Sequence, residues 1–385
     1  MAINVFVPTF RIDEILQEIR ICLEKGWTGL GFKTVEFENK WKEYTGLPNA
    51  HFLTSNTVGL HLAVHILKKK FGWNDGDEII TTPLTFVSTN HAIMYENLKP
   101  IFADVDDTLC LSPESVEARI TSKTRAVMYV GIGGNTGQYE KIIAICKKRN
   151  IKLILDAAHM SGTFFKGKHI GQESDVSIFS YQAVKNLPTS DSGMICFADA
   201  ELDKLARQLS WLGINKDTFQ RFQGKEGGYR WKYDVENVGF KYHGNSIQAA
   251  MALVQIKYLD EDNNYRNQLA SIYDDLLKDT PEVEVVKVAE NCQSSRHLYQ
   301  VFVKKRDEII QHFYDNDIFP GVHYIDNTEY SMYAYGSGTC PNAARRSNEI
   351  ISLPLHLKLK KEDCILIVGV LKSGIAKFLK NKSLV

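Results

Sequence analysis

Apolar positions along the first two thirds of the chain alternate between two spacings. A three- and four-residue spacing, typical of amphipathic helices, occurs in residues 57–72, 87–98, 112–121 and 138–150. Short and nearly continuous apolar runs, typical of buried strands, occur in residues 77–83, 99–105, 124–132 and 152–158. This alternation predicts an α/β fold in which helices cover both faces of a mostly parallel sheet.

The pattern changes after about residue 200. Two longer helical segments, residues 198–214 and 246–279, are followed by shorter apolar runs and a closing helical segment. We therefore predict a large α/β domain of residues 1–255 and a smaller α+β C-terminal domain of residues 256–385.

Composition narrows the classes of protein to consider. The 46 basic and 46 acidic residues cancel, which argues against a nucleic-acid or membrane-surface partner. No apolar segment approaches the roughly 20 residues of a membrane helix, and the N-terminal residues lack the regions of a signal peptide. The seven cysteines are scattered, without a CxxC pair or clustering with histidine. We expect a cytoplasmic protein with reduced, buried thiols and no metal site.

Polar residues follow the predicted strands, where ligands of doubly wound sheets bind. Ser55, Asn56 and Thr57 precede a helix whose free N–H groups could bind an anion, although a plain helix cap is the alternative. Asp156 ends an apolar strand, and a carboxylate there needs a cation or strong donors. Its alternative roles are a helix cap or a structural ion pair.

Two further residues complete this set. Phe86, shortly after a turn proline, could offer a flat face to a ring or could belong to the core. Lys185 lies between the apolar flanks of residues 177–197, where an exposed loop lysine is the alternative. Together these are the groups that pyridoxal phosphate requires: an anion site for its phosphate, a carboxylate for its ring nitrogen, a stacking face and a lysine amine.

The same segments carry a family resemblance. In chain order they read "TSNTVGLHLA", "PLTFVSTNHAI", "LDAAHMSG", "FSYQAVKNL" and "VGFKYHGNSIQAAM". The chain resembles, over nearly its whole length, the DegT/DnrJ/StrS sugar aminotransferases, which belong to fold-type I of the pyridoxal-phosphate enzymes. The resemblance implies a large domain with a mostly parallel, seven-stranded sheet and a small α+β C-terminal domain.

The resemblance also implies residue roles. Lys185 forms the Schiff base with the cofactor and then moves the proton, while Asp156 pairs with the pyridine nitrogen. The other implied cofactor contacts are Asn56, Thr57, Phe86, His159 and Ser180. For His159, a packing histidine is the alternative.

In this family the segment matching "FKYHGNS" reaches into the neighbouring subunit's site and helps to bind the cofactor's phosphate, which implies a homodimer with shared active sites. His243 stands there where relatives carry asparagine or arginine, and Asn245 is a second candidate for the same reach. Arg230, Lys232 and Tyr233 could clamp an anionic substrate group, or could form an exposed loop. His323 and Tyr324, in "GVHY", are further predicted substrate contacts.

The implied activity is a ping-pong transfer of an amino group from L-glutamate to a keto sugar, most plausibly nucleotide-linked. Three segments depart from the family pattern, namely "VGIGGNTGQYEK", "SDSGM" and "HYIDNTEY", and they favour a smaller phosphorylated or acidic keto substrate as the alternative. A sugar dehydratase is disfavoured by Lys185 and by the absence of clustered cysteines. A non-catalytic binding module is disfavoured because Lys185 and Asp156 are both present.

Overall fold

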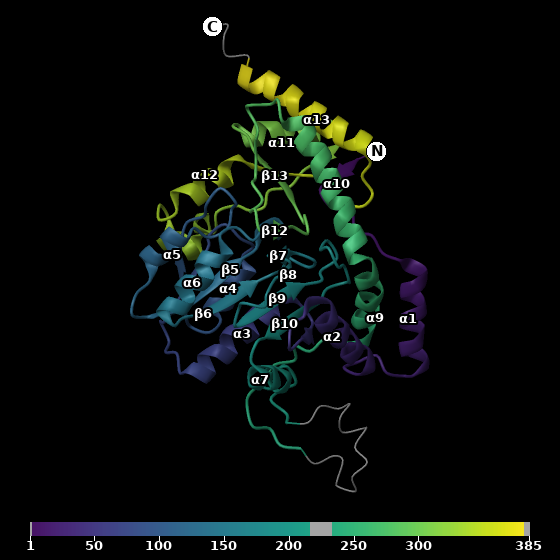
Figure 1. The fold of residues 1–385 in the computed structure, drawn as a ribbon, viewed down its shortest axis with the longest axis vertical. Coiled ribbons are helices and arrows are strands. Elements are labelled where there is room, and N and C mark those ends of the chain that lie inside the picture. Colours follow the sequence, from purple (N-terminus) through teal and green to yellow (C-terminus); the bar gives the residue numbers. More distant parts are fainter. Residues whose placement is uncertain (1, 216–232, 381–385) are drawn as a thin grey trace.

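The computed structural model describes residues 2–215 and 233–380. A central sheet lies between layers of helices, and a smaller unit of helices and strands packs at one end of it (Figure 1). The N-terminal residues lie in this smaller unit, beside the last helix (Figure 1). No helix among the described residues is long and apolar enough to cross a membrane.

The central sheet has seven strands in the order β2-β10-β9-β6-β5-β3-β4. They are β2 (His51–Leu53), β3 (Glu78–Thr81), β4 (Lys99–Phe102), β5 (Thr124–Val130), β6 (Lys152–Asp156), β9 (Val176–Ser180) and β10 (Gly193–Phe197). Only β10 runs antiparallel to its neighbours. The predicted α/β fold with a mostly parallel sheet of seven strands is therefore confirmed.

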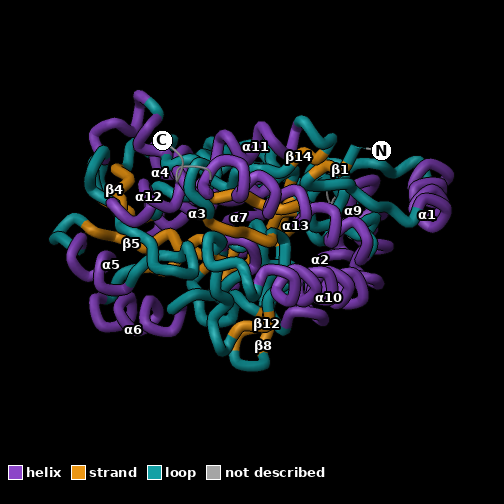
Figure 2. Tube along the Cα trace, turned by 90° about the horizontal axis from the view of Figure 1, so that it is seen from above, coloured by secondary structure: helices purple, strands orange, loops and turns teal. Residues whose placement is uncertain are grey.

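Helices cover both faces of this sheet, because the strands are apolar on both sides. In β5, Val127 and Tyr129 join the core on one face, whereas Ala126 and Met128 join the core on the other. Figure 2 shows the strands between α3 and α7 on one side and α5 and α6 on the other. The helices of this part are α1 (Ile12–Glu24), α2 (Phe32–Thr45), α3 (Asn56–Phe71), α4 (Ser88–Met94), α5 (Pro113–Arg119), α6 (Tyr139–Arg149), α7 (Ala200–Ser210) and α9 (Ser246–Gln255), with the short 3-10 helix η1 (Ile132–Gly134).

The smaller unit is built on a three-stranded antiparallel sheet with its own apolar core. The strands of this sheet are β11 (Glu284–Val285), β13 (Tyr299–Phe302) and β15 (Ile350–Leu353). Its helices are α10 (Leu259–Leu277), α11 (Arg306–Tyr314), α12 (Pro341–Glu349) and α13 (Lys361–Ile375), with the 3-10 helices η3 (Asn327–Glu329) and η4 (Ser331–Gly336) and a final π turn, η5 (Ala376–Lys380). Two small sheets join β1 (Ile3–Asn4) to β14 (Ile318–Phe319), and β7 (Phe164–Phe165) to β8 (Lys168–His169) and β12 (Cys292–Gln293).

The long helix predicted over residues 246–279 is interrupted. A short 3-10 helix, η2 (Ile256–Tyr258), separates α9 from α10. The domain boundary predicted at this point stays a prediction, because two connections cross it. β1 pairs in parallel with β14, and Tyr333 packs against Phe102 of the central sheet.

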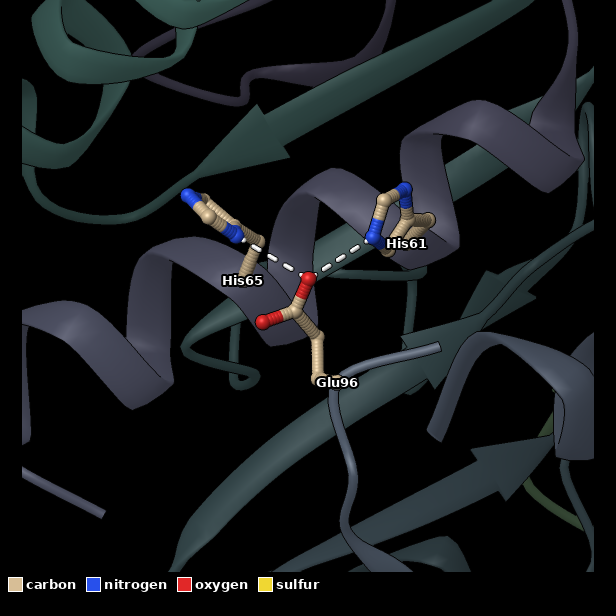
Figure 3. A group of neighbouring side chains, drawn as sticks. All are labelled: His61, His65 and Glu96. Atoms are coloured by element: carbon tan, nitrogen blue, oxygen red, sulfur yellow. Dashed lines mark hydrogen bonds and ion pairs between the residues drawn. The ribbon is translucent and has the colours of Figure 1, made fainter. Parts of the chain in front are cut away.

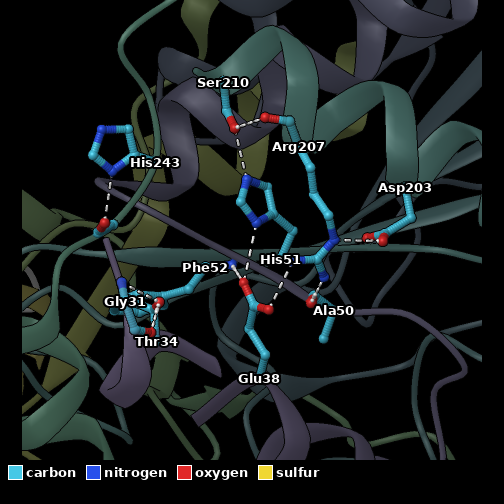
Figure 4. Close-up of polar contacts among 11 residues, drawn as sticks. Gly31, Thr34, Glu38, Ala50, His51, Phe52, Asp203, Arg207, Ser210 and His243 are labelled. Atoms are coloured by element: carbon cyan, nitrogen blue, oxygen red, sulfur yellow. Dashed lines mark hydrogen bonds and ion pairs between the residues drawn. The ribbon is translucent and has the colours of Figure 1, made fainter. Parts of the chain in front are cut away.

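A buried polar network ties α2, β2 and α7 together (Figure 4). Glu38 accepts hydrogen bonds from His51 Nδ1 at 3.0 Å, from the Phe52 N–H at 2.8 Å and from Arg207 at 2.8 Å. His51 Nε2 in turn lies 2.7 Å from the hydroxyl of Ser210, whose carbonyl oxygen accepts from the Tyr242 N–H. Burial alone would raise the pKa of Glu38, but Arg207 and His51 together lower it to about 2. The network thus anchors the segment that leads into α9.

We expect Glu38→Gln to lower the free energy of unfolding at neutral pH by about 1.5 to 3 kcal/mol, the scale of a lost hydrogen bond to a charged group. The folded-state pKa lies below the ordinary value of 4.5, so the Glu38 contribution is complete above pH 4.5 and is lost as the pH falls toward about 2. Urea unfolding at several pH values measures this. The control is Glu43→Gln, which removes only the exposed pair with Lys40. Equal effects of the two substitutions, or a Glu38 effect that grows in acid, would contradict the assignment.

Candidate active site

A cavity of about 450 Å³ lies at the carboxyl edge of the central sheet. Most of its wall follows the parallel strands β2, β3, β5, β6 and β9, all of which end at this edge. The residues that they contribute are Ser55, Asn56, Thr57, Thr85, Phe86, Ser88, Val130, Gly131, Asp156, Ala158, His159, Ser180, Gln182, Val184 and Lys185. Asp191 precedes β10, and the remaining wall comes from Phe6, His297, His323 and Tyr324.

Asp156 is a buried carboxylate at the end of β6, with only 4% of its surface exposed. One oxygen accepts from the Thr89 hydroxyl at 2.8 Å, and the other accepts from the Ala158 N–H at 3.2 Å and more weakly from Asn56 at 3.5 Å. Burial raises the pKa of Asp156, and the hydrogen bonds from Thr89 and Ala158 and the charge of Lys185 offset this rise only in part. A cationic group inside the cavity would offset that cost.

Lys185 occupies the turn between β9 and β10. Its backbone N–H donates to the Gln182 carbonyl oxygen at 2.8 Å, and the Gln182 side chain accepts from the Val184 N–H. These two hydrogen bonds, both within the turn, fix its conformation. Burial lowers the pKa of Lys185 to about 8, although the charge of Asp156 acts in the opposite direction. The amine therefore loses its proton far more readily than an exposed lysine, as a nucleophile must.

The start of α3 has the groups that an anion site requires. The Ser55 hydroxyl caps the helix by accepting from the Val58 N–H, while the N–H groups of Asn56 and Thr57 belong to the first turn and have no intrahelical acceptor. β10 passes close by, since a Cβ at Gly193 would come within 2.8 Å of the main chain of Ser55 and Asn56. Glycine at this position therefore allows the strand to pack against the helix start.

Three histidines in the cavity are neutral. His159 Nδ1 accepts from the Gly133 N–H at 3.1 Å, so its Nε2 carries the proton and donates to the Tyr324 hydroxyl, also at 3.1 Å. The His297 ring lies 4.3 Å from the His159 ring and stacks on Phe6. Burial lowers the pKa of His159 and His297 well below the usual value, and that of His323 to about 4.

The structure brings most of the predicted site residues together. The residues that line the cavity as predicted are Asn56, Thr57, Phe86, Asp156, His159, Ser180, Lys185, His323 and Tyr324. The Phe86 ring is 58% exposed and lies 6.1 Å from the Tyr324 ring, so an aromatic face is available beside the cavity.

Other predicted residues do not line the cavity of their own chain. His243 donates from Nδ1 to the Gly244 carbonyl oxygen, and Asn245 caps α9 by accepting from the Gln248 N–H. Tyr233 is 46% exposed, away from the cavity lining. Arg230 and Lys232 lie outside the described residues.

Several residues of the site were not predicted from the sequence, among them Thr89, Phe6 and His297. Thr89 donates to Asp156, while Phe6 and His297 close the cavity from the N-terminal segment and from the smaller unit. Thr89 lies within a helical pattern, and neither Phe6 nor His297 follows a strand of the central sheet. No local spacing therefore identified them.

Residues 11–372 match the model of the DegT/DnrJ/EryC1/StrS aminotransferase family. The chain belongs to this family. It is 34% identical to the spore coat polysaccharide biosynthesis protein SpsC of Bacillus subtilis, over 91% of each chain. Among solved structures, the aminotransferase TlmJ of Streptoalloteichus hindustanus aligns with a TM-score of 0.89 at 29% identity, covering 98% of this chain and 100% of TlmJ. Spr1654 of Streptococcus pneumoniae, in its PLP form, aligns with a TM-score of 0.89 at 26% identity, covering 98% and 99%.

The chain is thus a pyridoxal-phosphate-dependent aminotransferase with the fold-type I architecture. The cavity fits this cofactor. Asp156 is a buried carboxylate without a cationic partner among the described residues, the α3 N-terminus offers free N–H groups, and Lys185 is a lysine of lowered pKa beside both. These are the groups that a pyridinium nitrogen, a phosphate and an aldehyde require.

We expect the rate at which the cofactor-free protein captures pyridoxal phosphate to rise with pH and to level off above about 8, because only the deprotonated Lys185 amine is a nucleophile. Stopped-flow absorbance at a series of pH values measures this rate. Asp156→Asn removes the charge that raises the pKa of Lys185, so its profile should shift to lower pH. A flat profile, or a shift of the Asp156→Asn profile to higher pH, would contradict this role of the amine.

Proposed function

We propose that the protein moves an amino group from L-glutamate to a keto sugar, carried by a nucleotide, in two half-reactions at one site. The observation that carries this proposal is the convergence of Lys185, Asp156 and the α3 N-terminus on a single cavity. The relative SpsC acts in polysaccharide biosynthesis, which supports a sugar acceptor.

In this proposal six residues of the cavity wall contact the cofactor besides Lys185. The α3 N-terminus, with Asn56 and Thr57, binds the phosphate together with Ser180, while Asp156 keeps the ring nitrogen protonated. Phe86 covers the ring with its exposed face. His159, whose tautomer is fixed by Gly133, orients Tyr324 and faces the same cavity.

Lys185 carries the proton. Pyridoxal phosphate, when bound, withdraws electrons from the substrate carbon that bears the amine. The Lys185 amine would carry the proton from that carbon to the cofactor in the first half-reaction and from the cofactor to the acceptor carbon in the second. A pKa of about 8 suits this work, because the amine can both accept and release a proton near neutral pH.

Tyr324 is suited to hold an oxygen of the substrate. Its hydroxyl accepts the hydrogen bond from His159, so its own proton remains available for another acceptor. Burial raises the pKa of Tyr324, which keeps the hydroxyl protonated at neutral pH. His323, neutral and bonded at Nδ1 to the Ser352 hydroxyl, lies beside it in the cavity wall.

A second candidate acceptor is a smaller phosphorylated or acidic keto compound. Two of the segments that depart from the family pattern contribute directly to the cavity wall, at Gly131 and at Asp191. The part of the cavity wall that would contact the acceptor therefore differs from the family pattern more than the part that would contact the cofactor.

We also propose a homodimer with shared active sites. His243 and Asn245 lie outside the cavity of their own chain, as expected if they serve the neighbouring one. Large apolar side chains are left exposed on the chain, among them Tyr95 at 56% and Val238 at 91%, and a partner subunit would cover such residues.

The acceptor can be identified in half-reactions. L-Glutamate should abolish the visible absorption band of the bound cofactor. After removal of excess glutamate, a true acceptor should restore that band. The panel contains nucleotide-linked keto sugars, free keto sugar phosphates and small keto acids. We expect restoration by a nucleotide-linked keto sugar, and a response confined to the smaller compounds would favour the second candidate.

Lys185→Ala should lose activity by at least about 10³-fold, and normal turnover by this variant would refute the mechanism.

Shared sites can be tested by mixing two impaired variants, Lys185→Ala and His243→Ala. If the sites are shared, a mixed dimer has one site with both residues intact. After subunit exchange at equal amounts about half of the dimers are mixed, so activity should recover to about a quarter of the unmutated level. Activity equal to the sum of the two separate variants, in a sample where mixed dimers are demonstrated by differential tagging, would contradict shared sites.

A further inference from the structure

Two histidines and a glutamate converge away from the cofactor cavity (Figure 3). His61 and His65 lie four residues apart and therefore on one face of α3, while Glu96 lies in the turn that follows α4. His61 Nε2 and His65 Nδ1 both donate to the same oxygen of Glu96, at 2.8 Å and 3.0 Å. Their side chains are 10%, 22% and 13% exposed, so the cluster is largely buried but open to solvent on one side.

The spacing of these atoms is close to that of metal ligands. One ligand atom from each residue can be chosen so that all three lie within 4.8 Å of one another. Tetrahedral zinc, with bonds of about 2.0 to 2.2 Å, holds its ligand atoms about 3.3 Å apart. A small rotation of the three side chains would therefore make room for an ion between their ligand atoms, without movement of the main chain.

The surroundings orient the ligands. The Tyr242 hydroxyl lies 3.0 Å from His61 Nδ1, on the opposite side of the ring from Glu96, and the Glu96 carbonyl oxygen accepts from Lys68 Nζ at 2.6 Å. Such partners on the outer side of a ligand fix its ring and its tautomer. When Nε2 of His61 bound a metal, the proton would move to Nδ1 and be donated to Tyr242. His65 Nδ1, which donates to Glu96, would likewise give up its proton as Nε2 took one, so two neutral imidazoles would supply lone pairs with no net loss of a proton.

We propose that His61, His65 and Glu96 bind a divalent transition metal ion, with Zn²⁺ as the best fit. Two imidazoles and one carboxylate suit zinc, whereas Mg²⁺ and Ca²⁺ prefer oxygen ligands. Water occupies the fourth position on the open side. The ion links α3 to the turn after α4 and, through Tyr242, supports the segment that leads to His243. No metal site was predicted from the sequence, in which Glu96 is 31 residues from His65 and no local motif joins them.

Calorimetric titration of Zn²⁺ into the metal-stripped protein, with pyridoxal phosphate bound, tests the site. We expect about one equivalent to bind to the unmutated protein. Affinity should fall at least 10-fold in His65→Ala and in Glu96→Gln. Two controls should bind as the unmutated protein does: His312→Ala, a histidine on α11, and Cys292→Ser, which removes a partly exposed thiol.

Two further measurements locate the ion. Co²⁺ in place of Zn²⁺ should give the visible absorption of a four-coordinate nitrogen and oxygen site, without the near-ultraviolet bands of a cobalt-thiolate bond. Saturating Zn²⁺ should raise the melting temperature of the unmutated protein but not that of His65→Ala. Absence of Zn²⁺ binding, binding that persists in both His65→Ala and Glu96→Gln, or binding that is lost in Cys292→Ser would overturn the proposal.

Discussion

The arrangement of the active site depends on one carboxylate, which is buried at the end of a sheet strand and whose charge is costly to remove from water. Asp156 has donors from Thr89, Ala158 and Asn56 but no cation within ion-pair distance among the described residues, so its charge is only partly compensated by the protein. The neighbouring histidines do not supply a positive charge, because burial keeps them neutral. The cavity therefore favours a ligand that brings its own cationic ring. The lowered pKa of Lys185 follows from the same dry surroundings, so one physical cause prepares both groups for the cofactor.

Much of this site could be predicted from the sequence because parallel strands end at a common edge. Once the strand-helix alternation was recognised, the residues after each strand had to meet, which placed Asn56, Asp156 and Lys185 in one cavity. Residues whose position depends on long-range packing could not be found in this way. Phe6 and His297 reach the cavity from segments with no strand of the central sheet beside them, and the break in the helix at Ile256 leaves no glycine or proline signal. The same holds for the polar clusters. His51 and Glu38 look unremarkable in the sequence, and only the pairing of β2 with β10 and the packing of α7 bring them together with Ser210.

The segment around Tyr242 and His243 has no regular secondary structure, but several hydrogen bonds and a ring contact hold it in place. The Ser210 carbonyl oxygen, at the end of the Glu38 network, accepts from the Tyr242 N–H, and the Thr54 N–H donates to the Tyr242 carbonyl oxygen. The Tyr242 ring stacks on Phe240 and its hydroxyl meets His61. Two separate polar clusters thus hold the same short segment, one through the backbone of Tyr242 and the other through its side chain. A loop that has to present side chains in a fixed position needs this kind of support, because its own backbone provides little.

The parallel pairing of β1 with β14 has a consequence for biosynthesis. Ile3 pairs with Ile318, almost the full length of the chain away, and Phe6 enters the cavity wall only two residues after that strand ends. Residues 3–4 therefore cannot reach their final position until residues 318–319 have been made. The central sheet can form before these residues are made, but this wall of the cavity is completed only afterwards, so cofactor loading in the cell is expected to follow synthesis of residues 318–319.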